Sequence, residues 1–318
     1  MKRTSIRRAV VPGVAVLALA LSACGGSDAS GGEGDGSASG NVAVDGSSTV
    51  FPMSDAASEL LAEENPDVKV TVGESGTGGG FEAFCAGKTD ISDASRPIKD
   101  EEIAACEAEG IEYTELQVAT DALTVVTHKD LDVDCLTVDQ LIALWGPDST
   151  VTNWNELDPS FPDQKIALFG PGTDSGTYDY MAADVIGAES EATRTDYEAS
   201  EDDNVLVQGV AGTEGATGYF GYTYYEQNAD SLKALAIDSG NGCIEPSAET
   251  AQAGEYTPLA RPLFIYVNKA KYADNAATAA YVDFYIENLA EIAEIGQFIP
   301  LSEDLYAETT SSLEGLSS

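Results

Sequence analysis

Three short clusters of serine, threonine and glycine most constrain what this 318-residue chain can fold into. The clusters are Gly46-Ser47-Ser48-Thr49-Val50, Ser75-Gly76-Thr77-Gly78-Gly79-Gly80 and Asp174-Ser175-Gly176-Thr177. Each follows a predicted strand and precedes a predicted helix. Backbone N–H groups and hydroxyls at such a turn converge on a common centre and can surround an anion. Together with Arg96 in Ser95-Arg96-Pro97, the clusters predict a site for one small oxyanion.

Strands and helices are predicted to alternate along the chain. Strands are expected near residues 41–45, 68–72, 90–92, 112–116, 123–127, 165–169, 216–222, 233–237 and 262–267. Helices are expected to follow the three clusters and to cover residues 100–109, 138–145, 205–210 and 275–295. The core face of the last helix is predicted to consist of Tyr281, Phe284, Tyr285, Leu289 and Ile292. This order predicts an α/β fold, and roughly 275 residues after the N-terminal segment suit two lobes better than one core.

The N-terminus predicts export and a lipid anchor. A basic segment with Lys2, Arg3, Arg7 and Arg8 precedes an apolar run over 9–21 that is too short to span a membrane comfortably. The run ends in Leu21-Ser22-Ala23-Cys24, which resembles a bacterial lipobox. We therefore expect a signal peptide over 1–23, a lipid on Cys24, a flexible Gly/Ser-rich tether over 24–41 and a location on the outer face of the cell membrane. The alternative is an ordinary signal peptide followed by a chance cysteine.

Four further cysteines predict disulfides, because an exported chain lies in an oxidising compartment. They are Cys85, Cys106, Cys135 and Cys243, which allow three pairings. The pairs Cys85–Cys106 and Cys135–Cys243 are favoured, since each then stays within one lobe. No Cys-x-x-Cys or histidine pairing supports a metal site instead.

The chain is strongly acidic. Its formal net charge is -40, and removal of the four basic residues before Cys24 would bring the net charge to -44. This charge argues strongly against nucleic acid as a partner, because its phosphates require a basic surface. An anion ligand is not excluded, since a buried site is governed by its nearest dipoles rather than by net charge. The acidity itself is explained equally well by solubility or by a saline habitat.

Each feature of the site also has a simpler explanation. Any one cluster serine could only cap a helix, and Arg96 could only be a surface residue or a structural ion-pair partner. Enzyme chemistry has little support. Ser75 and Ser175 do not stand in a nucleophile elbow, His128 is the sole histidine, and the glycine-rich run lacks the lysine of a P-loop. We therefore expect a binding protein without cofactor or metal.

The clusters and their neighbours resemble phosphate-binding proteins of the PstS type. The resemblance rests on Val44–Pro52, Ser75–Phe81, Asp90–Ile98, Thr173–Tyr178 and Gly215–Tyr222, and it covers nearly all of residues 42–306. It implies a two-lobe type II periplasmic-binding fold with a hinge and an inter-lobe cleft. Lobe I would comprise 42–127 plus 265–318, and lobe II 128–264. It also implies a monomer that binds inorganic phosphate outside the cytoplasm and delivers it to the permease of an ABC importer.

The resemblance also implies a ligand set. It comprises Ser48, Thr49, Ser75, Gly76, Thr77, Ser175, Gly176 and Thr177, with Arg96 as the cation. Well-known members have an aspartate where Arg96 stands, and an arginine four residues before their equivalent of Ser175, where this chain has Pro171. Phosphate near neutral pH carries a proton and sulfate does not, so selectivity for phosphate needs an acceptor. Asp174 and Asp203 are candidates by position, and a hydroxyl oxygen could also serve as the acceptor. The alternatives are a protein for sulfate or another tetrahedral oxyanion, or a secreted phosphatase or esterase using Ser75 or Ser175.

Overall fold

A computed structural model describes residues 38–173, 175–187 and 192–316. The predicted signal peptide, Cys24 and most of the tether lie outside the described residues, as does Asp174. Within the described ranges, no helix is long and apolar enough to cross a membrane.

The first half of the fold is built on parallel strands. β1 (Gly40–Gly46), β2 (Val68–Val72) and β3 (Ile91–Ala94) run in the order β2-β1-β3. The helices of this half are α1 (Phe51–Glu64), α2 (Gly76–Cys85), α3 (Asp100–Ala108), α10 (Lys269–Asp274), α11 (Ala276–Glu287), α12 (Leu289–Ile295) and α13 (Glu303–Glu314). The buried side chains of α1, α11 and α12 form one core with those of β1 and with Val68 of β2.

The second half has its own core around Trp145, Trp154 and Tyr219. Its strands are β5 (Cys135–Thr137), β6 (Ala167–Gly170), β7 (Glu198–Ala199), β8 (Ala216–Gly221), β9 (Leu232–Ala234), β10 (Ala236–Asp238) and β11 (Cys243–Ile244). Its helices are α4 (Val138–Trp145), α5 (Trp154–Leu157), α6 (Gly176–Tyr180), the π-helical turn η1 (Met181–Ile186), α7 (Asp203–Gly212), α8 (Tyr222–Gln227) and α9 (Ala248–Gln252). β5, β10 and β11 form a small separate sheet.

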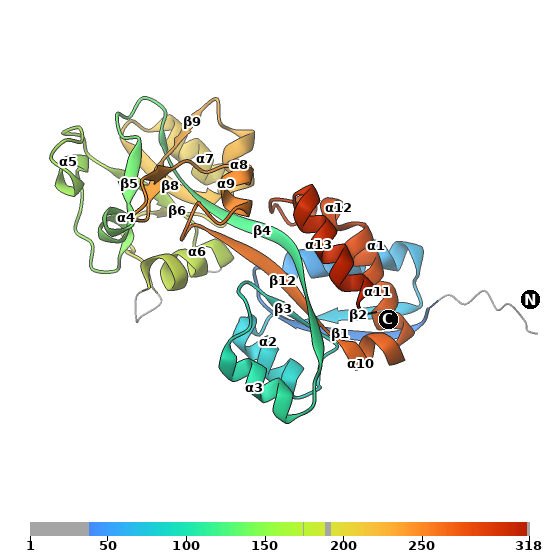
Figure 1. The fold of residues 1–318 in the computed structure, drawn as a ribbon. Coiled ribbons are helices and arrows are strands. Elements are labelled where there is room, and N and C mark those ends of the chain that lie inside the picture. Colours follow the sequence, from blue (N-terminus) through green and yellow to red (C-terminus); the bar gives the residue numbers. More distant parts are fainter. Residues whose placement is uncertain (1–37, 174, 188–191, 317–318) are drawn as a thin grey trace, which may run out of the picture. The chain divides into compact units, whose positions relative to one another are not determined.

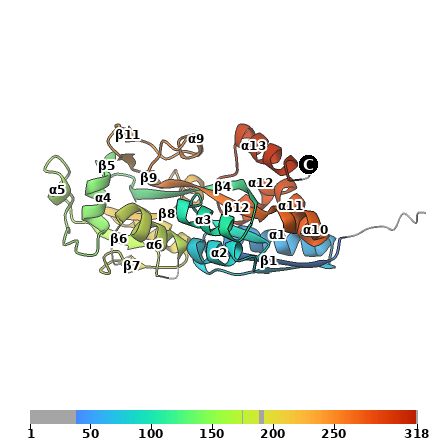
Figure 2. The same ribbon diagram turned by 60° about the horizontal axis from the view of Figure 1, so that its bottom comes forward.

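Two long antiparallel strands run from one half to the other, β4 (Tyr113–His128) and β12 (Ala260–Asn268) (Figures 1 and 2). β12 pairs with β3, and the far end of β4 pairs with β8 and β9, so the main sheet is continuous. The prediction of separate strands over 112–116 and 123–127 is wrong. Polar Asp121 does not interrupt the strand, because it lies opposite Arg261 of β12 and forms an ion pair with it. The predicted lobe limits at 127–128 and 264–265 fall on these two strands and stay a prediction.

The predicted helix over 275–295 is two helices. Asn288 ends α11, and its side-chain amide donates a hydrogen bond to the carbonyl of Phe284. Side chains of both helices nevertheless reach the same core, with Tyr281, Tyr285 and Ile292 fully buried.

Both favoured disulfide pairings are present. Cys85–Cys106 joins the end of α2 to α3, and Cys135–Cys243 joins β5 to β11 in the small sheet. Each bridge therefore lies within one half of the fold, as predicted.

Candidate functional site

The first two clusters lie at the carboxyl edge of the parallel strands. α1 connects β1 to β2, and α2 connects β2 to β3 on the other side of β1. This reversal of strand order is where α/β sheets place their ligands. The positive ends of the α1 and α2 dipoles come to the same edge. Neither helix is capped by a side chain at its N-terminus, where Val50 and Ser75 are the capping positions.

The first loop, residues 47–50, is held in place by a hydrogen bond to β3. The Ser47 amide donates to the Asp93 carbonyl oxygen at 3.0 Å. Gly46 has a φ of +146°, and a Cβ on it would lie 2.2 Å from that same oxygen, so only glycine fits. Ser48 is left exposed and Thr49 half-buried.

The second loop is fixed by a carboxylate and a hydroxyl. The Ser75 amide donates to Asp45 Oδ1 at 3.0 Å. Thr77 Oγ1 accepts from the Ser95 amide at 3.2 Å. Gly80 serves packing rather than the ligand, because a Cβ there would lie 2.5 Å from the Gly46 Cα. The glycine run therefore has two uses: Gly76 adopts a φ of +80° at the turn, and Gly80 lets α2 lie against β1.

The third loop begins α6 in the second half. Ser175 Oγ accepts from the Thr177 amide at 3.2 Å, so this serine does cap its helix, as the simpler explanation anticipated. Gly176 faces the first loop: a Cβ on it would lie 3.4 Å from Thr49 Oγ1. The first and third clusters are far apart in the sequence, yet they lie within contact distance across the two halves.

Arg96 lines a cavity of about 570 Å³ next to the second loop, but its charge is already partnered. The cavity is lined by Gly76, Thr77, Gly78, Ser95, Arg96, Asp179, Ala183 and Asp184. Both terminal nitrogens of Arg96 donate to Glu102 at 2.8 Å, and these hydrogen bonds raise the pKa of Arg96. The structural ion pair considered for Arg96 in the sequence is therefore present, and its role as a ligand stays a prediction.

Arg261 is a cation that sequence reasoning missed. It lies on β12, where its Nη2 donates to Thr49 Oγ1 at 3.1 Å and its Nη1 to Asp184 at 2.7 Å. Its guanidinium carbon lies 3.7 Å from the centre of the Tyr180 ring. Arg261 was not singled out from the sequence, because no local motif marks it as a neighbour of the clusters.

Of the two carboxyl groups named as candidate acceptors, only Asp203 can be placed. Asp174 is outside the described residues. Asp203 begins α7, where burial and then the nearby Asp202 and Glu201 carboxylates raise its pKa to about 6. Asp203 is not among the residues that line the cavity, whereas Asp179 and Asp184 are.

The enzyme alternatives gain nothing from the geometry. His128 ends β4, where its Nδ1 accepts a hydrogen bond from the Asp130 amide at 3.3 Å. Across the described ranges, no cluster of three or more histidine, cysteine, aspartate or glutamate side chains could hold a metal ion.

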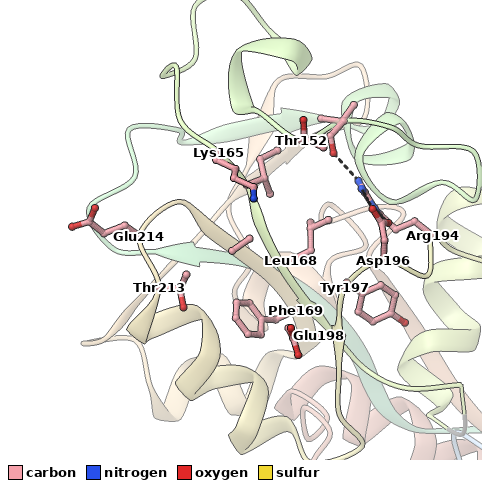
Figure 3. Close-up of a pocket in the computed structure, with 13 residues that line it drawn as sticks. Thr152, Lys165, Leu168, Phe169, Arg194, Asp196, Tyr197, Glu198, Thr213 and Glu214 are labelled. Atoms are coloured by element: carbon pink, nitrogen blue, oxygen red, sulfur yellow. Dashed lines mark hydrogen bonds and ion pairs between the residues drawn. The ribbon is translucent and has the colours of Figure 1, made fainter.

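A second cavity of about 580 Å³ lies in the other half, beside β6 (Figure 3). Arg194 lies at its rim and is buried, with 2% of its surface exposed. It donates to both carboxylate oxygens of Asp196 and to the backbone carbonyls of Leu144 and Val151. These bonds use the Arg194 donors within the protein, and none of the described residues of the three clusters lines this cavity.

Comparison with known proteins identifies the family. A family model described as a PBP superfamily domain matches residues 31–288. Protein SphX of Synechococcus elongatus is 47% identical over 272 residues, which cover 85% of this chain and 80% of that protein. The phosphate-binding protein PstS of Staphylococcus saprophyticus is 40% identical over 301 residues, which cover 94% of this chain and 91% of that protein. The chain belongs to the PstS family of phosphate-binding proteins.

Solved structures agree with PstS membership. The crystal structure of a possible phosphate-binding protein from Planctomyces limnophilus is 44% identical, with a TM-score of 0.84, and the match covers 89% of this chain and all of that one. PstS from Borrelia burgdorferi, 23% identical with a TM-score of 0.64 over 82% of this chain and 99% of that one, shares the fold. The predicted α/β fold of the periplasmic-binding type is confirmed. PstS proteins are named for binding, and theirs is not an enzyme family.

Proposed function

We propose that this protein binds inorganic phosphate where its three Ser/Thr-Gly loops meet, and that it delivers the phosphate to an ABC importer. The ligand set is the one implied by the sequence, namely Ser48, Thr49, Ser75, Gly76, Thr77, Arg96, Ser175, Gly176 and Thr177. The PstS relatives, named for phosphate binding, support the choice of ligand. The polypeptide would act as a monomer, with no covalent chemistry.

The observation that carries the proposal is the state of the loop hydroxyls. Thr49 Oγ1 accepts from Arg261, and Ser175 Oγ accepts from the Thr177 amide. A hydroxyl has one proton and two lone pairs. When an N–H already occupies a lone pair, the hydroxyl proton remains available to an acceptor. Thr77 Oγ1 also accepts from the Ser95 amide, but it shares a further hydrogen bond with the Ser95 hydroxyl, so Thr49 and Ser175 are the two hydroxyls that support the proposal. Such hydroxyls, beside two uncapped helix N-termini, replace the water of a hydrated anion with fixed donors.

Arg96 would supply formal positive charge from the edge of the cavity. Its bond to Glu102 does not prevent this, because the guanidinium has five N–H donors. The Arg96 side chain is 31% exposed. The charge that reaches the anion is reduced by Glu102, so most of the binding would come from hydroxyl and amide donors.

Export and anchoring belong to the same proposal. A signal peptide over 1–23, a lipid on Cys24 and the tether would hold the protein on the outer face of the membrane, beside the permease. The halves joined by β4 and β12 would act as lobes that close on phosphate about these two strands.

Calorimetry on ligand-stripped protein, with phosphate and then sulfate, tests the proposal. Phosphate at a hundredfold excess over its Kd should raise the free energy of unfolding by about 2.7 kcal/mol. Ser175→Ala should weaken phosphate binding about tenfold, because a charge-assisted hydrogen bond is lost. Ser160→Ala is the matched control, since this exposed serine bonds only its own turn through Asp158 in the described structure.

Three results would contradict the proposal. Absence of phosphate binding would remove the function. Equal responses to phosphate and sulfate would make the protein a general oxyanion binder. Turnover of an aryl phosphate that Ser175→Ala abolishes would make it an enzyme.

A further inference from the structure

Arg261 has one partner at each of its three nitrogen atoms. Nε donates to Asp121 of β4 at 3.2 Å, Nη1 to Asp184 of η1 at 2.7 Å, and Nη2 to Thr49 Oγ1 at 3.1 Å. The guanidinium packs on the Tyr180 ring, and 13% of the arginine side chain is exposed. A planar guanidinium held on four sides has little freedom, so it fixes the positions of its partners relative to one another.

The partners of Arg261 belong to different parts of the proposed site. Thr49 belongs to the first anion loop, in the first half of the fold. Asp184 lines the cavity that contains Arg96 and Thr77, but it comes from the second half. Asp121 anchors the arginine to the neighbouring crossing strand. One side chain therefore connects a donor from one half to a carboxylate from the other.

The contacts of Nη1 and Nη2 leave one hydrogen-bond donor and one acceptor for a ligand. Nη2 occupies a lone pair of Thr49 Oγ1, so the Thr49 hydroxyl keeps its proton to donate. Nη1 binds Oδ2 of Asp184, whose side chain is 55% exposed. An ionised carboxylate has about four lone-pair positions and no proton, so Asp184 retains capacity to accept one.

We propose that Arg261 is a positioning residue that sets Thr49 as a donor and Asp184 as the proton acceptor, and thereby selects a protonated oxyanion over an unprotonated one. This inference rests on the proposed phosphate binding. An oxyanion that carries a proton can donate it to Asp184. A fully ionised oxyanion such as sulfate has no proton to donate to the Asp184 carboxylate, and repulsion between the like charges weakens its binding.

A purely structural role makes different predictions. Arg261 lies opposite Asp121 in the β4–β12 pair, and the ion pair alone would stabilise the strands. In that case, substitution of Asp184 would leave the ratio of phosphate to sulfate affinity unchanged, since Asp184 is not in this strand pair.

The test is the phosphate and sulfate affinity of Asp184→Asn, measured by calorimetry on full-length protein. The phosphate-to-sulfate ratio should fall at least tenfold, about the effect of one hydrogen bond to a charged group. Asp139→Asn is the control, because it removes one exposed carboxylate of the second half at a position that does not line the cavity. Its ratio should stay within about threefold of wild type. An unchanged ratio in Asp184→Asn, or an equal fall in both variants, overturns the assignment.

The arginine itself is tested by Arg261→Lys. A lysine keeps the charge but cannot hold three partners in a plane, so phosphate affinity and the ratio should both fall. If the variant unfolds because Asp121 is left unpaired, Arg261→Gln combined with Asp121→Asn removes the ion pair without a buried charge. A folded variant with the wild-type ratio refutes the role of Arg261. Failure of wild-type protein to bind phosphate would instead refute the proposed function.

Discussion

Replacement of buried Asp93 by asparagine should change how stability depends on pH. Asp93 lies on β3, where its backbone carbonyl accepts from Ser47 of the first loop, and it has no exposed surface. Oδ1 accepts from the Ser54 hydroxyl at 2.9 Å, whereas Oδ2 has no partner among the described residues. Burial raises the pKa of Asp93 from 3.8 to about 8. The Ser54 hydrogen bond lowers the pKa, and the nearby Asp45 carboxylate raises it.

The sign of the effect follows from proton linkage. The folded protein holds the Asp93 proton more tightly than the unfolded chain does. The stabilisation is therefore complete below about pH 4, and it is lost as the pH rises through about 8. Within that window each pH unit costs about 1.4 kcal/mol, or roughly 6 kcal/mol in all. The asparagine side chain cannot ionise, so Asp93→Asn should become more stable relative to wild type as the pH rises.

Urea unfolding of wild type and Asp93→Asn at steps across this window measures the difference directly. The comparison cancels the other titrating groups that both proteins share. Ser54→Ala is a useful companion, because loss of its hydrogen bond raises the pKa of Asp93 further and moves the loss of stability to higher pH. A difference between Asp93→Asn and wild type that is constant from about pH 4 to 8 would refute the reasoning.

Three further predictions concern the candidate site and the residues that stabilise the fold around it. Arg96→Ala should weaken phosphate binding at least tenfold, and Glu102→Gln should strengthen it, because the Glu102 carboxylate accepts from both terminal nitrogens of Arg96. Titration calorimetry measures both affinities, and an unchanged affinity in Arg96→Ala would make Arg96 a structural residue only. Replacement of Cys85 and Cys106 by serine should lower the free energy of unfolding by about 3 kcal/mol, from the entropy of the closed loop, as urea midpoints would register. Gly46→Ala should destabilise by at least about 2 kcal/mol, since its φ is +146° and its Cβ would meet a backbone oxygen; a wild-type melting temperature would contradict this.

Local features of the chain predicted much of the fold. The alternating strands and helices around the first two clusters were expected within a few residues, because apolar periodicity and turn residues act over short distances. The loop containing Gly46 and the loop containing Gly76 were placed correctly between strand and helix, since both need backbone angles that favour glycine. The disulfide pairs followed from the assignment of each cysteine to one lobe.

Contacts between distant residues were not predictable in the same way. The sequence alone determined the three clusters, their order and their resemblance to the PstS family. Only the tertiary structure decided that Gly176 lies against Thr49, that Arg96 is bound by Glu102, and that Arg261 joins the first loop to Asp184. Arg261 is 212 residues from Thr49, and no local pattern records such a contact. It exists because β12 crosses from one half of the fold to the other and brings the guanidinium to the edge where the parallel strands end.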